Sequence, residues 1–242
     1  MGETCLVVNP AYARQVAFAE LAPTMATENR LKTLPDIDRL KALCQSLAML
    51  DAIMSPDWEY RYYSFDSKWG LNEMMASMRN GQGDDFFILF NNNGAIIKGF
   101  DHEAPMTPYA HKPKRVWPGV LDDVPDVFRD FLDEPAFTIE DTTFCFWRRS
   151  EDSRWSIGNI AYPKGADPDG SDQLLAMLDG KPETYREFAE EYYEKNIPLS
   201  AIDHIYNHQP LTNEIIASLN PGVSFADLKA DMENIRYSRI AS

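Results

Sequence analysis

Two short apolar runs flank a polar turn in the segment 84–102, DDFFILFNNNGAIIKGFDH. The first run, FFILF, is rich in aromatic residues, and the second, AIIKGF, carries β-branched residues near its start. Between them stands Asn91-Asn92-Asn93-Gly94, and an Asn-Gly pair tolerates the positive φ angles of tight hairpin turns. The pattern therefore predicts a β-hairpin over 84–102.

Other segments also have the pattern of strands. Aromatic and charged residues alternate at the start of 58–64, which predicts a strand with its aromatic side facing the core. The segments 142–149 and 155–162 predict a second hairpin, with its turn at 150–153. Both faces of 142–149 are apolar, so we expect this strand in the middle of the sheet, covered on both sides.

Apolar residues at spacings of three and four predict helices before, between and after these strands. The clearest helix spans 35–54, with Pro35 in its first turn and Pro56 beyond its end. A second is predicted over 67–79, where leucine and methionine recur at helical spacing, and a short acidic one over 121–131. Further helices are predicted to begin at Asn9-Pro10, Ser171, Pro182, Ser200, Thr212 and Ser224.

Together these elements predict an α+β fold. Its centre would be an antiparallel sheet of about five strands, formed by strand 58–64 and the two hairpins, with N- and C-terminal helices covering it. We expect a single domain over 1–242. Its parts in chain order would be an N-terminal helical segment 1–56, a sheet-bearing core 57–162, a boundary loop 163–170 and a C-terminal helical subdomain 171–240.

Composition changes this picture little. With 242 residues, 44% of them hydrophobic and 25% charged, the chain has the balance of a globular protein with a large core. The formal net charge of −15 argues against binding to nucleic acid or an anionic membrane, which requires clustered lysine and arginine. The same charge is compatible with a basic protein partner, although acidity also serves solubility alone.

Targeting and redox signals point to a cytoplasmic protein. The N-terminus lacks the pattern of a signal peptide, and no apolar run approaches the ~20 residues of a membrane span. The 3 cysteines, Cys5, Cys44 and Cys145, have neither disulfide nor metal-site spacing. Cys44 and Cys145 lie in apolar patterns, so we expect buried, reduced thiols there.

The most unusual segment is the connection 103–120, EAPMTPYAHKPKRVWPGV, because long irregular loops in compact domains are often functional. It follows Asp101-His102-Glu103, where a carboxylate could orient the histidine as a general base. The simpler interpretation is a polar strand exit, since adjacency in sequence does not set geometry. The predicted binding residues are Asp101, His102, Glu103, His111, Arg115 and Trp117.

No motif for a known chemistry is present. His204 and His208 are four apart on a predicted helix, but the zinc-protease pattern requires glutamate after the first histidine, and Ile205 stands there. The chain has no GxSxG, GxxxxGK[ST] or GxGxxG sequence. A thiolate is disfavoured at both buried cysteines. The sequence therefore predicts neither a catalytic residue nor a cofactor or metal site.

Four phrases of the chain are YRYYSFDSKW at 60–69, MRNG at 78–81, IKGFDHE at 97–103 and WPGV at 117–120. They resemble those of an uncharacterised bacterial family of small acidic cytosolic proteins. The resemblance covers about 50–220 and implies a toxin-immunity or accessory role, with no catalytic residues to carry over.

Two functions remain open. The first is a non-catalytic, acidic binding protein, of immunity type, that engages a basic protein partner. The second is a small-molecule-binding protein or hydrolase-like enzyme with its pocket at the hairpin exit and loop, over 99–117.

Overall fold

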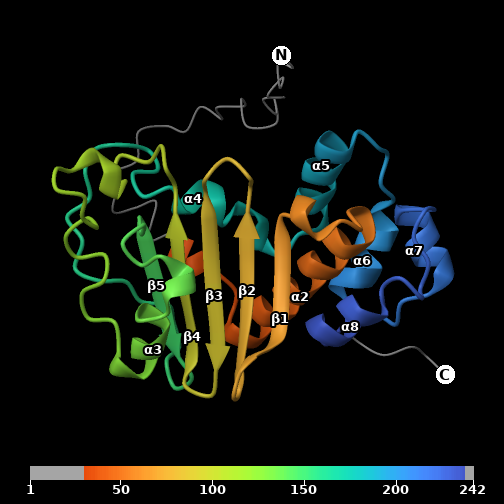
Figure 1. Cartoon of the computed structure of the whole chain (residues 1–242), viewed down its shortest axis with the longest axis horizontal. Helices are drawn as coiled ribbons and strands as arrows, with labels where there is room; N and C mark the ends of the chain where they lie inside the picture. Colours follow the sequence, from red (N-terminus) through yellow and green to blue (C-terminus); the bar gives the residue numbers. More distant parts are fainter. Residues whose placement is uncertain (1–29, 238–242) are drawn as a thin grey trace, which may run out of the picture.

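A computed structural model describes residues 30–237 of the chain. Its centre is a five-stranded antiparallel sheet in the order β1-β2-β3-β4-β5, so each strand pairs with its neighbour in sequence (Figure 1). This confirms the predicted α+β class. The strands are β1 (Tyr63–Gly70), β2 (Glu73–Arg79), β3 (Asp85–Asn91), β4 (Gly94–Phe100) and β5 (Phe144–Arg149).

Helices stand before and after the sheet in the chain. The long helix α2 lies behind the sheet in Figure 1 and contacts β1, α6 and α8, while helices α5 to α8 gather beyond β1. Asp36 caps α2 by accepting a hydrogen bond from the Arg39 amide. The α-helices are α2 (Ile37–Met54), α3 (Arg129–Leu132), α4 (Ser171–Leu174), α5 (Pro182–Tyr193), α6 (Leu199–Tyr206), α7 (Asn213–Leu219) and α8 (Lys229–Ile235).

The hairpin predicted over 84–102 is confirmed as β3 and β4. Asn91 pairs with Gly94, which leaves two residues in the turn. Gly94 has a φ of 140°, and a Cβ there would lie 2.1 Å from the Arg148 carbonyl oxygen of β5. A glycine is therefore required both for the backbone angle and for close approach of the next strand.

The helix predicted over 67–79 is wrong, because this segment forms the β1–β2 hairpin. The turn falls at Leu71-Asn72, where Asn72 adopts a left-handed φ of 61°. Strand β2 pairs on both sides, and Met74 and Met75 contact the apolar clusters on opposite faces of the sheet. A strand covered on both faces needs no alternation, so its apolar run was open to a helical interpretation.

The strand predicted over 58–64 is displaced towards the C-terminus. Trp58–Tyr60 is a 3₁₀ helix, and β1 begins only at Tyr63. The reason lies in α2, where the buried Asp51 carboxylate accepts hydrogen bonds from the Tyr62 and Tyr63 amides, each at 2.8 Å. These bonds fix where the chain enters the sheet and leave the 3₁₀ turn outside it.

The second predicted hairpin is only half formed. Strand β5 exists, but the segment 155–162 meets it through a single bridge between Trp147 and Ser156. The chain then leaves the sheet, because Gly158 packs closely on Gly119. A Cβ on Gly158 would lie 1.9 Å from the carbonyl oxygen of Gly119. Strand β5 is covered on both faces as expected, but it lies at the end of the strand order and not in the middle.

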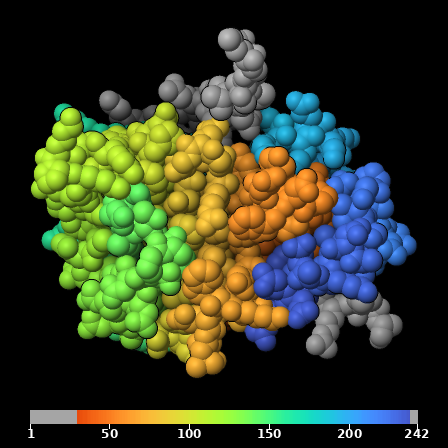
Figure 2. Space-filling view, viewed as in Figure 1, coloured from red at the N-terminus to blue at the C-terminus, as the bar shows by residue number. Residues whose placement is uncertain are grey.

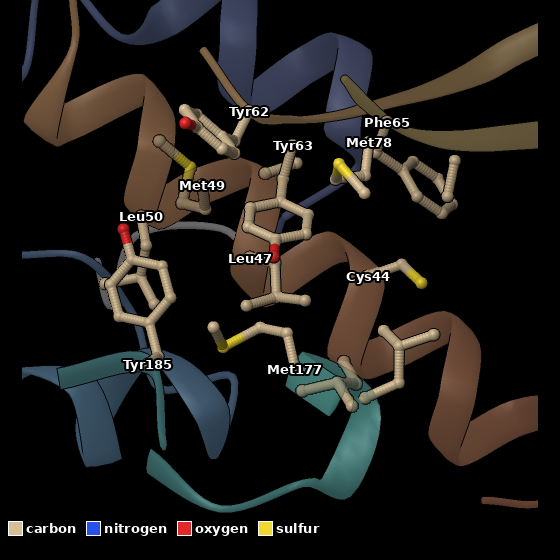
Figure 3. Packing of buried hydrophobic residues seen from close by; sticks show 14 of the residues in the cluster. Cys44, Leu47, Met49, Leu50, Tyr62, Tyr63, Phe65, Met78, Met177 and Tyr185 are labelled. Carbon is tan, nitrogen blue, oxygen red and sulfur yellow. The ribbon is translucent and has the colours of Figure 1, made fainter. Parts of the chain in front are cut away.

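Two apolar clusters lie on opposite faces of the sheet. The larger one joins α2, one face of the strands and the C-terminal helices, and Figure 3 shows its side chains from α2, β1 and α5 in contact. Its centre also holds Asp51, which accepts a hydrogen bond from the Tyr185 hydroxyl at 3.0 Å. The smaller cluster covers the other face with α3 and the long loop. Cys44 and Cys145 are buried and free, as predicted.

The remaining helical predictions are met in part. Helix α5 begins at Pro182, and Thr212 caps α7 by accepting a hydrogen bond from the Ile215 amide. The starts predicted at Ser200 and Ser224 are wrong, because α6 begins at Leu199 and α8 only at Lys229. The helix predicted over 121–131 shrinks to a 3₁₀ turn and α3. The helix predicted to begin at Asn9-Pro10 lies outside the described residues. Between Arg30 and Tyr237, no helix is both long and apolar enough to cross a bilayer.

Candidate functional site

The hairpin exit brings a histidine and an aspartate together. Asp85 pairs with Phe100 at the open end of β3 and β4, so the residues just outside that pair are neighbours in space. Asp84 Oδ1 accepts hydrogen bonds from the His102 amide at 2.9 Å and from its ring Nδ1 at 2.6 Å. Asp84 is 8% exposed at its side chain and His102 is 42% exposed, so a buried carboxylate orients a half-exposed imidazole.

This pairing alters the proton affinity of the ring. The hydrogen bond to Asp84 raises the pKa of His102 above its usual value, against a smaller opposing effect of burial. The other ring nitrogen, Nε2, lies 3.9 Å from a Glu103 carboxylate oxygen. A histidine held in this way can accept and return a proton at Nε2, which is the role of a general base in catalysis.

Asp101 has a structural role at the same exit. Its Oδ1 accepts hydrogen bonds from the Glu103 amide at 2.8 Å and the Ala104 amide at 3.0 Å, which turns the chain away from β4. A Cβ on Gly170 would lie 2.4 Å from Asp101 Oδ2, so the loop 163–170 packs directly on this carboxylate. Burial raises the pKa of Asp101. These contacts explain an aspartate at this position without invoking a ligand.

Asp84, Asp101 and His102 are the described residues that could hold a metal ion. Their ligand atoms lie within 4.8 Å of one another, and two carboxylates with one imidazole suit a first-row divalent ion. However, the His102 ring nitrogen nearest to Asp84 is hydrogen-bonded to it, and Asp101 Oδ1 already accepts two amides. These ligand groups are thus already engaged in hydrogen bonds within the protein.

The other predicted site residues make their contacts outside this cluster. The rings of His111 and Trp117 pack on each other at 5.5 Å, and Trp117 donates a hydrogen bond to the Ala161 carbonyl. Arg115 is exposed. Across residues 30–237, no hydrogen bond or ion pair joins His111 to His102. The structure therefore brings together Asp101, His102 and Glu103, and adds Asp84.

Asp84 was missed in the sequence, although a signal for it was present. Once 84–102 is recognised as a hairpin, the residues before its first strand and after its second must meet at the same edge. That rule places Asp84 beside His102.

The long loop packs against the sheet. Tyr109 contacts Phe100 with ring centroids 6.0 Å apart, and Lys114 lies 4.3 Å over the Tyr109 ring and forms an ion pair with Asp141. Below them, Lys98 is fully buried and bonded to Asp85 at 3.2 Å. Lys98 is thus buried, whereas its partner Asp85 keeps 27% of its side chain exposed.

A cavity of about 400 Å³ lies at the opposite end of the hairpin. Asn92 and Gly94 of the hairpin turn line it, together with Asp36 at the start of α2 and Arg148 of β5. The hypothesis of a pocket over 99–117 gains no support from this location.

The pair His204 and His208 does not form a helical metal motif. Helix α6 ends at Tyr206, and His208 adopts a left-handed φ of 51° beyond it. The Nε2 of His204 bonds to the Pro210 carbonyl, and the Nε2 of His208 bonds to the Ala42 carbonyl, both at 2.8 Å. Both rings therefore fasten chain segments to each other.

The fold defines an α+β protein with a helix-covered antiparallel sheet. Comparison with protein-family models, curated proteins and solved structures found no match to the chain. The resemblance to a bacterial immunity-type family stays a prediction.

Proposed function

We propose that this protein is a non-catalytic, cytoplasmic binding protein of immunity type that engages a basic protein partner. The carrying observation is the excess of acidic residues, 38 Asp and Glu against 23 Lys and Arg. A surface of one sign steers an oppositely charged partner and raises its association rate.

One segment of the surface is densely acidic. The segment around α3 exposes several aspartates, with Arg129 as the basic residue among them. Arg129 reaches a single carboxylate, that of Asp126, at 3.5 Å. The exposed aspartates are Asp122, Asp123, Asp126, Asp130 and Asp133. Such a cluster serves long-range attraction, which weakens as salt screens it.

The test is affinity capture on the immobilised protein from a bacterial lysate, at low and at high salt. We expect basic proteins to be retained at low salt and released at high salt. An unrelated protein of similar net charge serves as the control, and retained proteins must be absent from it. If no basic protein is retained specifically at low salt, the proposal loses its support.

A second candidate function rests on the 2.6 Å contact between Asp84 and His102. This geometry favours proton transfer on a small molecule at the hairpin exit, as in a hydrolase-like enzyme. A thermal-shift screen of metals and metabolites tests it, because a ligand that binds the folded state raises its melting temperature. Stabilisation that disappears in His102→Ala but persists in His111→Ala supports the candidate, and stabilisation that persists in both contradicts it.

A further inference from the structure

Two large aromatic side chains project into solvent from the link between α2 and β1. Trp58 is 63% exposed and Tyr60 is 60% exposed. Asp57 and Glu59, which alternate with them along the chain, are exposed as well. We call these four residues the aromatic-acidic patch. Large apolar side chains are normally buried on folding, so two exposed ones separated by a single residue form an apolar surface that a partner could cover.

The patch stands on a rigid support. The residue that follows it, Arg61, donates to the Ser55 and Pro56 carbonyls at 2.8 and 2.9 Å. Its guanidinium also holds both oxygens of Asp231 on α8, at 2.6 and 3.2 Å. Because Arg61 is neutralised by Asp231, its charge does not offset the acids of the patch. A pre-organised surface loses less conformational entropy when it binds.

The position of the patch also favours contact with a partner. Figure 2 shows the surface of this region, in orange, between the light-blue surface of α5 and the dark-blue surface of α8. Tyr62, just beyond the patch, packs on Phe188 and Tyr192 of α5 with centroids 5.2 and 4.8 Å apart. Along the chain, the two exposed aromatic residues are thus followed by one that packs on α5.

The other exposed large apolar residues do not combine the same features. Tyr109 already has the Lys114 ammonium over its ring, in a loop that carries further basic residues. Leu71 stands alone in the β1–β2 turn, and Val127 near α3 is aliphatic. Among residues 30–237, the aromatic-acidic patch is therefore the place where exposed aromatic rings are flanked by exposed carboxylates.

We propose that the aromatic-acidic patch is the surface that docks a lysine- or arginine-bearing segment of the basic partner. This inference rests on the proposed function and names its binding surface. The rings of Trp58 and Tyr60 offer cation–π contacts and apolar area, while Asp57 and Glu59 offer ion pairs to the same cationic groups. Trp and Tyr are also among the residues that dominate binding energy at protein interfaces.

The experiment measures binding of fluorescein-labelled peptides by anisotropy at low salt, with an unstructured Arg-Gly-Gly repeat as the probe and a Glu-Gly-Gly repeat as its control. The test variant is the double substitution Trp58→Ala and Tyr60→Ala. The matched control is the double substitution Leu71→Ala and Tyr109→Ala, which also removes exposed apolar area. Neither variant alters the net charge.

We expect the basic peptide to bind the wild type, and the patch variant to weaken binding by about tenfold or more. The matched control should stay within about twofold of the wild type, as expected for residues outside the contact. A third variant, Asp122→Asn with Asp126→Asn and Asp130→Asn, tests the acidic cluster near α3.

Other outcomes would contradict either the docking surface or the proposed function. If the patch variant binds as well as the wild type, or if only the aspartate variant loses affinity, the patch is not the docking surface and the proposed function still stands. If the wild type binds neither the basic peptide nor any basic protein in the capture experiment, the proposed function fails as well.

Discussion

Asp169 is a buried carboxyl group at the end of the loop 163–170. Its Oδ1 accepts a hydrogen bond from the Ser171 amide at 3.0 Å, while its buried Oδ2 has no partner among the described residues. Burial, together with the nearby Asp167, raises the pKa of Asp169 to about 7. The next residue, Gly170, packs on Asp101, so the loop contacts the hairpin exit beside this carboxyl group.

The first prediction concerns Asp169→Asn. Below pH ~4 the carboxyl group is protonated in both the folded and the unfolded state. Between pH ~4 and the folded pKa of about 7, only the unfolded chain releases the proton, so the free energy of unfolding falls as pH rises. The variant lacks this loss, so its stability relative to wild type should increase across this pH window, by at most about 1.4 kcal/mol for each pH unit.

Urea denaturation at several pH values between about 4 and 8 checks this prediction. The control is Asp122→Asn, which removes the same charge from an exposed position. A stability difference between Asp169→Asn and wild type that does not change with pH would contradict the assignment.

The second residue-scale prediction concerns the ion pair of Lys98 and Asp85. Burial lowers the pKa of Lys98 and raises that of Asp85, so both groups are poorly solvated when charged. Lys98→Met alone leaves the Asp85 carboxylate without its cation and should cost about 3 kcal/mol. Adding Asp85→Leu should recover most of that loss, because a buried ion pair contributes little over an apolar pair.

A double-mutant cycle by urea denaturation measures this coupling. Additive losses in the two single variants would show that the pair does not act as a unit.

At the scale of elements, the segment 155–162 depends on one close backbone contact. Gly158 and Gly119 belong to segments with no regular pairing, yet a Cβ on Gly158 would clash with the Gly119 carbonyl. Nearby, the Trp117 indole donates to the Ala161 carbonyl at 3.1 Å. This packing holds the end of the long loop and draws 155–162 away from β5.

Gly158→Ala should therefore separate the two segments and destabilise the protein by about 1–3 kcal/mol, the usual range for overpacking. Gly222→Ala is the matched control, since the nearest atom to a Cβ there lies 3.4 Å away. Urea denaturation measures the free energy of unfolding of the two variants. Equal stabilities would show that the 119–158 contact is not tight.

At the scale of the whole molecule, the excess of negative charge produces repulsion between like charges. A net charge of −15 opposes the compact state, because folding brings like charges closer together. The ion pairs formed are mostly exposed and contribute little stability each.

Salt should accordingly raise the melting temperature. We expect an increase between low and moderate NaCl at constant pH, because added ions screen the repulsion. Differential scanning calorimetry measures it, and the α3 variant Asp122→Asn, Asp126→Asn and Asp130→Asn should show a smaller increase. A melting temperature that falls with salt would mean that attractive pairs outweigh repulsion.

The candidate site was predictable in part. Asp101, His102 and Glu103 were found because they follow a hairpin whose turn is legible in the sequence. Asp84 escaped notice because its partner lies 18 positions away. His111 and Trp117 were grouped with them by loop position alone, and the folded loop turns them towards each other instead.

What the sequence by itself determined is whatever depends on neighbours along the chain. The 84–102 hairpin, helix α2 and the start of α5 follow from turn residues, proline positions and apolar spacing. Only the tertiary structure decided that 73–79 is a strand, because its two covered faces come from distant segments. Tertiary contacts also decided where the chain enters the sheet. Hydrogen bonds to Asp51 keep the Trp58–Tyr60 turn outside the sheet, so two aromatic rings stay exposed. Burial and long-range hydrogen bonds thus override local propensity where the two disagree.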